Sequence, residues 1–196
     1  MRVYGDSGSG NCLKVKYTAD RLGLPYDWIE VDITKGTTRT PEYLKMNPMG
    51  QVPTVEFSDG RHLSQSNAII RYLAAGSELL PDDRFAQAKI DELLFWEQYS
   101  HEPYVAVCRY QMVYLERPKE ARETWRVERG EVALDFMEKW LSDRNWFVGQ
   151  AFSIADIALL AYTRLAAEGG FDLSSRMALR KWITSSEREL GLPALN

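Results

Sequence analysis

The N-terminal stretch 1-MRVYGDSGSGNCLKVKYTADRLGLPY-26 decides the fold. Its first residues, Arg2 to Tyr4, predict a short strand, and the residues from about Cys12 to Leu22 predict a helix that Gly23 ends. Small polar residues lie between these two elements: Ser7, Gly8, Ser9, Gly10 and Asn11. Such a loop is either an ordinary turn or a binding site, because hydroxyls and unpaired backbone N–H groups converge where a helix begins.

The rest of the N-terminal half alternates strands and helices. Strands are predicted at 26–31, 53–57 and 61–63, the last two joined by a turn at 58–60. A short helix runs from Pro41 to Leu44. Another has Ala68, Ile69, Tyr72 and Leu73 on one face. The order β-α-β followed by β-β-α predicts a small mixed sheet, parallel in its first half and antiparallel in its last hairpin.

The second half is predicted to be helical, with four or five helices. The Gly-, Pro- and Asp-containing segment 76–84 fits a linker better than a buried element. A long helical pattern covers 85–115, and Pro103 should kink it near Tyr99. A second helix at about 121–141 carries Val132, Phe136 and Trp140 at helical spacing, and a last helix covers 176–189.

The four residues from Ser153 to Asp156 form a helix-starting capping box. In this motif, each of the two side chains binds a backbone N–H of the helix end. We therefore assign Asp156 to folding and not to catalysis.

Composition narrows the functional class. The chain has 196 residues, 45% hydrophobic and 27% charged, with a net charge of −4. These values are typical of a globular protein without the basic patch that nucleic acid or an anionic membrane would need. It has no apolar run long enough to span a bilayer, and Arg2 and Asp6 lie where a signal peptide would be apolar, so we expect a cytoplasmic protein.

The two cysteines and two histidines do not indicate a disulfide framework or a metal site. Cys12 and Cys108 lie far apart without a C-x-x-C pair, so we expect no disulfide framework. His62 and His101 belong to no recognisable metal motif, and we expect no bound metal. Cys12 lies in the first turn of its helix, where the pKa of a thiol can fall.

Two further stretches contain candidate binding residues. In 47-NPMGQVPTVEF-57, a cis Val52–Pro53 bond would turn the backbone of Val52 outward to pair with an extended peptide, although a trans proline at a strand entry is commoner. In 64-SQSNAIIRYL-73, Ser66 and Asn67 open a helix whose positive end attracts a carboxylate. The alternative interpretation is that these residues form an ordinary helix N-cap.

In chain order, Ser9-Gly10-Asn11-Cys12, Gln51-Val52-Pro53 and Gln65-Ser66 resemble the motifs of the cytosolic glutathione transferases, in a serine-type, bacterial, theta-like form. The resemblance covers essentially the whole chain. It implies an α/β thioredoxin-like domain at 1–77 and an all-α domain at 85–196. It also implies a detoxifying enzyme that uses glutathione as co-substrate, without a permanently bound cofactor, and forms a homodimer.

The resemblance also assigns roles to residues. Ser9 would activate the glutathione thiol, with Asn11 as the second choice and Ser7 as a further rival. Val52 would pair with the cysteinyl backbone, which requires a cis Pro53, and Ser66 would hold the γ-glutamyl carboxylate. The residues at the glycine end would be Arg39 and Gln51. Two departures from the family pattern are Gln65, where most relatives have Glu, and Thr38, where some classes have His.

A small electrophile would bind near the kinked helix, where Tyr104 and Arg109 are the candidates for an open site. Each of them also has an ordinary structural interpretation. Two alternatives to a transferase are left open. One is a glutathione-dependent reductase of disulfides or peroxides, and the other is a non-catalytic glutathione-binding protein.

Overall fold

A computed structural model describes residues 1–194 of the chain. Internal contacts divide the chain into two compact units, Met1–Leu80 and the part from Pro81 onward. Each unit has its own core and is described by itself. Within the described residues, no helix is both long enough and apolar enough to cross a membrane.

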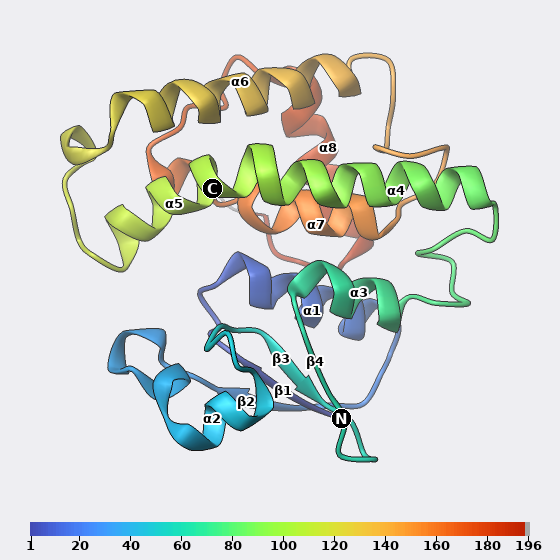
Figure 1. The fold of residues 1–196 in the computed structure, drawn as a ribbon. Coiled ribbons are helices and arrows are strands. Elements are labelled where there is room, and N and C mark those ends of the chain that lie inside the picture. Colours follow the sequence, from blue (N-terminus) through green and yellow to red (C-terminus); the bar gives the residue numbers. More distant parts are fainter. Residues whose placement is uncertain (195–196) are drawn as a thin grey trace. The chain divides into compact units, whose positions relative to one another are not determined.

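The first unit contains a four-stranded sheet and three α-helices (Figure 1). Its elements in chain order are β1 Arg2–Gly5, α1 Gly10–Arg21, β2 Asp27–Glu30, α2 Pro41–Met46, β3 Thr54–Glu56, β4 His62–Ser64 and α3 Ser66–Leu73. Two 3-10 turns, Ile33–Lys35 and Thr37–Arg39, precede α2. The predicted order of strands and helices is therefore confirmed.

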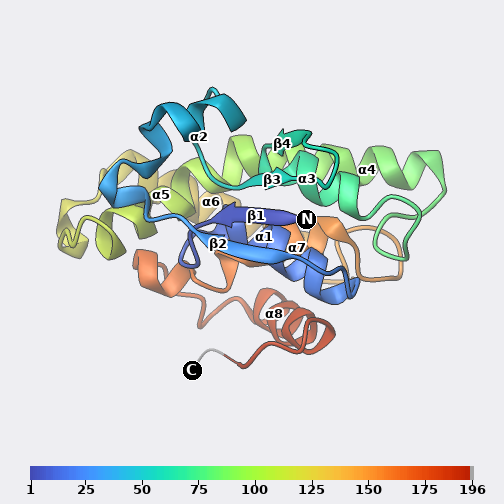
Figure 2. The same cartoon turned by 90° about the horizontal axis from the view of Figure 1, so that it is seen from below.

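The sheet is mixed, as predicted. Its strand order is β2-β1-β3-β4, and Figure 2 shows β2 and β4 at its two edges. The pair β1–β2 is parallel, whereas β1–β3 and β3–β4 are antiparallel. Val3 on β1 lies opposite Val55 on β3, and both side chains are fully buried. Helices α1 and α3 contact each other and lie over one face of the sheet (Figure 1).

Local sequence signals explain where the helices of this unit begin. The hydroxyl of Thr40 accepts a hydrogen bond from the backbone N–H of Tyr43, and Pro41 occupies the first turn of α2. Helix α1 begins at Gly10 rather than near Cys12, because Ser9 already has the extended conformation of an N-cap residue. This places the Gly10–Asn11 part of the small polar loop inside the helix.

Two predictions about burial in this unit are wrong. Helix α3 buries Ser66, Ile69 and Ile70, whereas Ala68 and Tyr72 are exposed. The prediction is confirmed for Ile69 and wrong for Ala68 and Tyr72. The segment interpreted as a linker also buries Leu79 and Leu80, which are 1% and 4% exposed. Burial of a leucine side chain is favourable, so Leu79 and Leu80 pack into the unit even though the Gly and Pro content of the segment suggests a turn.

The second unit consists of helices. They are α4 Arg84–Trp96, α5 Glu102–Val113, α6 Thr124–Leu141, α7 Ile154–Thr163 and α8 Met177–Glu189. Short 3-10 turns lie at Lys119–Ala121 and Ala166–Gly169. No strand occurs between residues 81 and 194, which confirms the helical prediction for this part of the chain.

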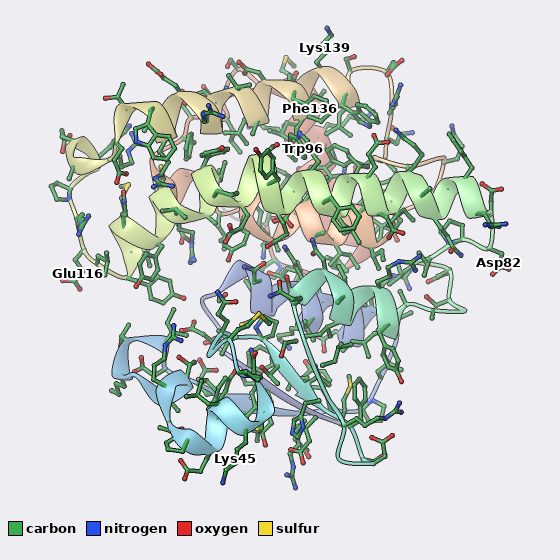
Figure 3. The ribbon with its side chains drawn as sticks, in the orientation of Figure 1. Lys45, Asp82, Trp96, Glu116, Phe136 and Lys139 are labelled. Carbon is green, nitrogen blue, oxygen red and sulfur yellow. The ribbon has the colours of Figure 1, made fainter. Side chains whose placement is uncertain are left out.

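The interruption predicted near Tyr99 is a π-helical turn. It spans Glu97–His101 between α4 and α5, and Pro103 lies in the first turn of α5. Just before it, Trp96 packs on Phe136 of α6 with a distance of 4.6 Å between ring centroids (Figure 3). Val132 does not share this packing and is 68% exposed, so the apolar face predicted for α6 is wrong at this position.

Helix α7 forms the centre of the second unit. All its residues are buried, and it contacts α4, α5 and α8. The capping box of Ser153 and Asp156 is present as predicted. Asp156 also accepts hydrogen bonds from the Phe147 backbone N–H at 3.1 Å and from the Trp182 indole at 2.9 Å. Complete burial nevertheless raises the pKa of Asp156 to about 6. Its contacts are those of a folding residue.

Candidate functional site

The first candidate site residue is Ser9, at the N-terminus of α1. The preceding loop is fixed by Asp6, whose carboxylate accepts from the Gly8 N–H at 2.8 Å and whose carbonyl accepts from the Ser9 N–H at 3.0 Å. Ser9 is the N-cap residue, but its side chain makes no capping hydrogen bond. Its half-buried hydroxyl therefore lies at the positive end of the helix dipole without serving to cap the helix.

Ser7, the rival serine, is held by Glu30 at the end of β2. Its backbone N–H and its hydroxyl both donate to Glu30 Oε1, at 2.9 and 3.1 Å. Burial opposes ionisation of Glu30, but hydrogen bonds from Ser7 and Trp28 outweigh it and lower the pKa of the carboxyl. The Ser7 hydroxyl is thus engaged by a carboxylate, whereas the Ser9 hydroxyl makes no capping bond and is hydrogen-bonded to the Cys12 thiol.

Asn11, the second-choice donor, joins α1 to α3. Its Oδ1 accepts from the Ser66 hydroxyl at 2.9 Å and from the Lys14 ammonium at 2.9 Å. Ser66, 5% exposed, and Asn11 are 55 positions apart in sequence. The structure therefore brings together two residues that sequence analysis placed in separate motifs.

The bond between Val52 and Pro53 is cis, as the predicted role of Val52 requires. Within residues 1–194, the backbone N–H and C=O of Val52 make no hydrogen bond. The turn before it is fixed through the Gln51 carbonyl, which accepts from the Tyr43 hydroxyl at 2.9 Å and from the Asn47 amide at 2.7 Å. A fixed turn thus presents one free backbone donor and one free acceptor, as an edge strand does.

The side chains of Arg39 and Gln65 both contact Met49, which lies in the turn before Val52. The Arg39 guanidinium donates to the Met49 carbonyl at 3.2 Å, and the Gln65 amide lies 3.5 Å from the Met49 sulfur. Gly50 has a φ of 61°, and a Cβ atom there would come within 2.9 Å of the Thr38 carbonyl oxygen, so the turn requires glycine at this position. Gln65 has a φ of 70°, which is uncommon for a residue other than glycine and occurs most often at functional positions.

Thr38 and Gln51 complete the glycine-end candidates. Thr38 is 6% exposed, so its side chain is largely withdrawn from solvent. The side chain of Gln51 is exposed. Of the residues predicted here, Arg39 and Gln51 therefore have side chains at the surface of the unit.

The expectation that the thiol of Cys12 is acidified is wrong. Burial raises its pKa to about 12, and this outweighs the opposing hydrogen bonds from the Asp6 backbone N–H and the Ser9 side chain. Cys12 is fully buried in α1 and stays protonated at physiological pH. At Cys12 the cost of burying a thiolate is therefore larger than any stabilisation by the helix N-terminus.

The residues predicted for the electrophile lie in the second unit and have structural partners there. Tyr104 packs edge-to-face on Trp125, with 6.2 Å between ring centroids. Arg109 is 7% exposed and pairs with Glu168 at 2.7 Å, joining α5 to the Ala166–Gly169 turn. These contacts agree with the ordinary structural interpretation of both residues.

Lys14 is the site neighbour that sequence analysis missed. It is fully buried, and its ammonium also reaches Asn67 Oδ1 at 3.3 Å. The apolar spacing of α1 gave no signal for it, because position 14 lies on the side of the helix that carries Gly10, Tyr17 and Thr18, and this side is buried as well. Among the described residues there is no cluster of His, Cys, Asp or Glu that could hold a metal ion.

Comparison with known proteins shows the family to which the chain belongs. Residues 8–75 match the family model of the glutathione S-transferase N-terminal domain, and residues 95–188 match that of the C-terminal domain. A glutathione S-transferase structure from Pseudomonas fluorescens is 46% identical, with a TM-score of 0.94 over 100% of this chain and 98% of the other.

Two further relatives extend the comparison. A glutathione S-transferase structure from Xanthobacter autotrophicus is 41% identical, with a TM-score of 0.91 over 100% of this chain and 95% of the other. A curated glutathione S-transferase of Arabidopsis thaliana is 29% identical over 96% of this chain and 92% of its own. The similarity to these proteins therefore extends over both units.

Proposed function

Because the chain belongs to the glutathione S-transferase family, we propose that its first unit binds glutathione and ionises the thiol for attack on a small electrophile. In this proposal, Ser9 donates its hydroxyl hydrogen to the sulfur. The observation that carries the proposal is that this hydroxyl, at the start of α1, makes no capping bond, whereas that of Ser7 is bound to Glu30.

The energy needed for ionisation is within reach of these groups. A thiol with a reference pKa of about 8.5 is only a few per cent thiolate at pH 7. Lowering that pKa by about two units requires roughly 2.7 kcal/mol of selective anion stabilisation. A hydrogen bond to a charged group supplies about 1.5–3 kcal/mol, and a helix N-terminus adds about 0.3–1 kcal/mol. The two together suffice without a histidine base.

The other site residues hold the tripeptide. Val52 pairs its unbonded N–H and C=O with the cysteinyl backbone, and Ser66 binds the γ-glutamyl carboxylate at the start of α3. Arg39 and Gln51 bind the carboxylate at the glycine end, which is supported by the exposure of both side chains. Gln65 takes the position next to the α-amino group as a neutral amide.

The experiment that tests the proposal measures binding and turnover separately. Calorimetry should show glutathione binding, and ultraviolet titration of the complex should show a thiolate pKa below the free value. Turnover is then assayed with an aryl halide, a mixed disulfide and a peroxide. Conjugation of the halide supports the transferase, whereas reduction of the disulfide or peroxide alone would replace it by a reductase. Binding without any turnover would make the protein a glutathione-binding module, and no binding would refute the site.

We also propose that the protein forms a homodimer. Its support is an apolar surface on α4 and the π-helical turn that follows: Phe85, Phe95 and Tyr99 are 74%, 75% and 80% exposed. Large exposed apolar side chains on one element are typical of protein interfaces. Sedimentation should give a dimer for the wild type and a monomer for Phe95→Glu. Lys139→Glu, on the surface of α6, is the matched control, and a monomeric wild type would refute the dimer.

A further inference from the structure

Lys14 lies behind the proposed glutathione site and has no assigned role. We infer that Lys14 is a positioning residue that holds Asn11 in place while Ser66 turns its hydroxyl to the γ-glutamyl carboxylate of glutathione. This inference rests on the proposed function, and it concerns how one contact of that site is prepared.

The geometry joins the first turns of two helices. From α1, the Lys14 ammonium donates to Asn11 Oδ1 at 2.9 Å and to Asn67 Oδ1 of α3 at 3.3 Å. An ammonium group can only donate, so the oxygen of each amide must face it. The NH₂ groups of Asn11 and Asn67 consequently face away from Lys14. Both asparagines are half-buried and Lys14 is fully buried, so this arrangement is part of the packed interior.

Ser66 has a single hydroxyl hydrogen, and in this structure it is given to Asn11 Oδ1 at 2.9 Å. To bind a carboxylate, which only accepts, Ser66 must donate that hydrogen to the ligand instead. Asn11 Oδ1 then loses the bond from Ser66. Loss of a donor to a partly buried acceptor costs free energy, but here the bond from Lys14 remains. Lys14 therefore lowers the free-energy cost of moving the Ser66 hydrogen bond from Asn11 to the ligand.

The inference predicts that the effect of Lys14 depends on one group of the ligand. Lys14→Met keeps the approximate length of the side chain and removes every donor. We expect it to weaken glutathione binding about tenfold, equivalent to about 1.4 kcal/mol, because Asn11 Oδ1 then loses the bonds from both Lys14 and Ser66 when the ligand binds. An analogue whose γ-glutamyl α-carboxylate is an amide can donate as well as accept. We expect its affinity to change less than twofold, about 0.4 kcal/mol.

The experiment compares both ligands by calorimetry on wild type, Lys14→Met and Lys16→Met. Lys16 is the matched control, because it lies on the same helix but pairs with Asp20 at 2.9 Å. Loss of affinity for glutathione alone supports the inference. Equal loss for both ligands would mean that Lys14 has only a structural role, and no loss for either would also overturn it. A wild type that binds neither ligand would instead refute the proposed function.

A second variant keeps the test decisive if Lys14→Met does not fold. Asn11→Ala removes the acceptor that competes for the Ser66 hydrogen. The ratio of the two affinities, glutathione over amide analogue, should then equal or exceed that of the wild type. A ratio that falls would show that Asn11 does not compete with the ligand for Ser66, and it would overturn the inference.

Discussion

Replacing Ser9 by alanine tests the central step of the proposed mechanism. The structure shows a hydroxyl at the start of α1 that makes no capping bond, so its removal should leave the helix end intact. The loss is that of one hydrogen bond to a charged sulfur, about 1.5–3 kcal/mol. At 1.36 kcal/mol for each pKa unit, the thiolate of bound glutathione should titrate about 1–2 units higher in Ser9→Ala.

The sign of the rate effect follows from this shift. The thiolate is the nucleophile, so raising its pKa lowers the reactive fraction at neutral pH and leaves it unchanged at high pH. With a wild-type thiol pKa of about 6.5 in the complex, conjugation at pH 7 should therefore fall about 3- to 25-fold, with most of the loss recovered at alkaline pH. The assay is ultraviolet titration of the complex together with a pH–rate profile, measured at saturating glutathione.

Ser7→Ala is the matched control in the same loop. Its hydroxyl is bound to Glu30, so we expect a shift of less than about 0.4 units, as for an ordinary surface substitution. The reasoning is refuted if Ser9→Ala titrates like the wild type. An unchanged titration would transfer the donor role to the Asn11 amide, whose NH₂ faces away from Lys14.

Three further predictions concern the site and the core. Gln65→Glu should tighten glutathione binding about two- to fivefold by supplying a carboxylate to the α-amino group, and weaker binding by calorimetry would reject this. Cys12, with its pKa raised to about 12, should resist alkylation by iodoacetamide at pH 8 until the protein is unfolded, as followed by mass spectrometry. The pKa of Asp156 is raised to about 6 because burial outweighs its hydrogen bonds. The native state therefore binds the Asp156 proton more tightly than the unfolded chain does. This tighter proton binding stabilises the native state by about 3 kcal/mol at low pH, and the stabilisation is lost as pH rises from about 4 to 6. The difference in urea midpoint between wild type and Asp156→Asn should show this slope, and a constant difference would contradict it.

Features set by local chemistry were predictable from the sequence. The capping box at Ser153, the start of α2 at Thr40 and Pro41, and the interruption near Tyr99 each depend on residues within one or two helical turns. The mixed sheet followed from the order of its elements. These signals act within the segment that carries them, so the rest of the fold does not change their meaning.

The buried faces of the helices were less predictable. Tyr72 and Val132 fit the apolar spacing of their helices but are 52% and 68% exposed. Their neighbours Ile70 and Leu134 are fully buried instead. Apolar spacing gives a range of possible faces, and the elements packed against the helix select one. In the same way, the candidate residues of the site were predictable one motif at a time, but the bond between Asn11 and Ser66 was not.

The loose periodicity of α1 has a physical explanation that bears on Lys14. Its buried face includes Lys14 and Thr18, which are both fully buried, and the Thr18 hydroxyl donates back to the Lys14 carbonyl at 2.9 Å. An apolar side chain at position 14 would stabilise the fold by about 1.5–3 kcal/mol through burial, so a lysine there sacrifices stability. Removing Lys14 also takes a donor from Asn11 and from Asn67, which offsets that gain. Lys14→Met should therefore change the melting temperature little while it weakens glutathione binding. A purely structural lysine would lower both together, so a parallel loss of stability and affinity would count against the positioning role.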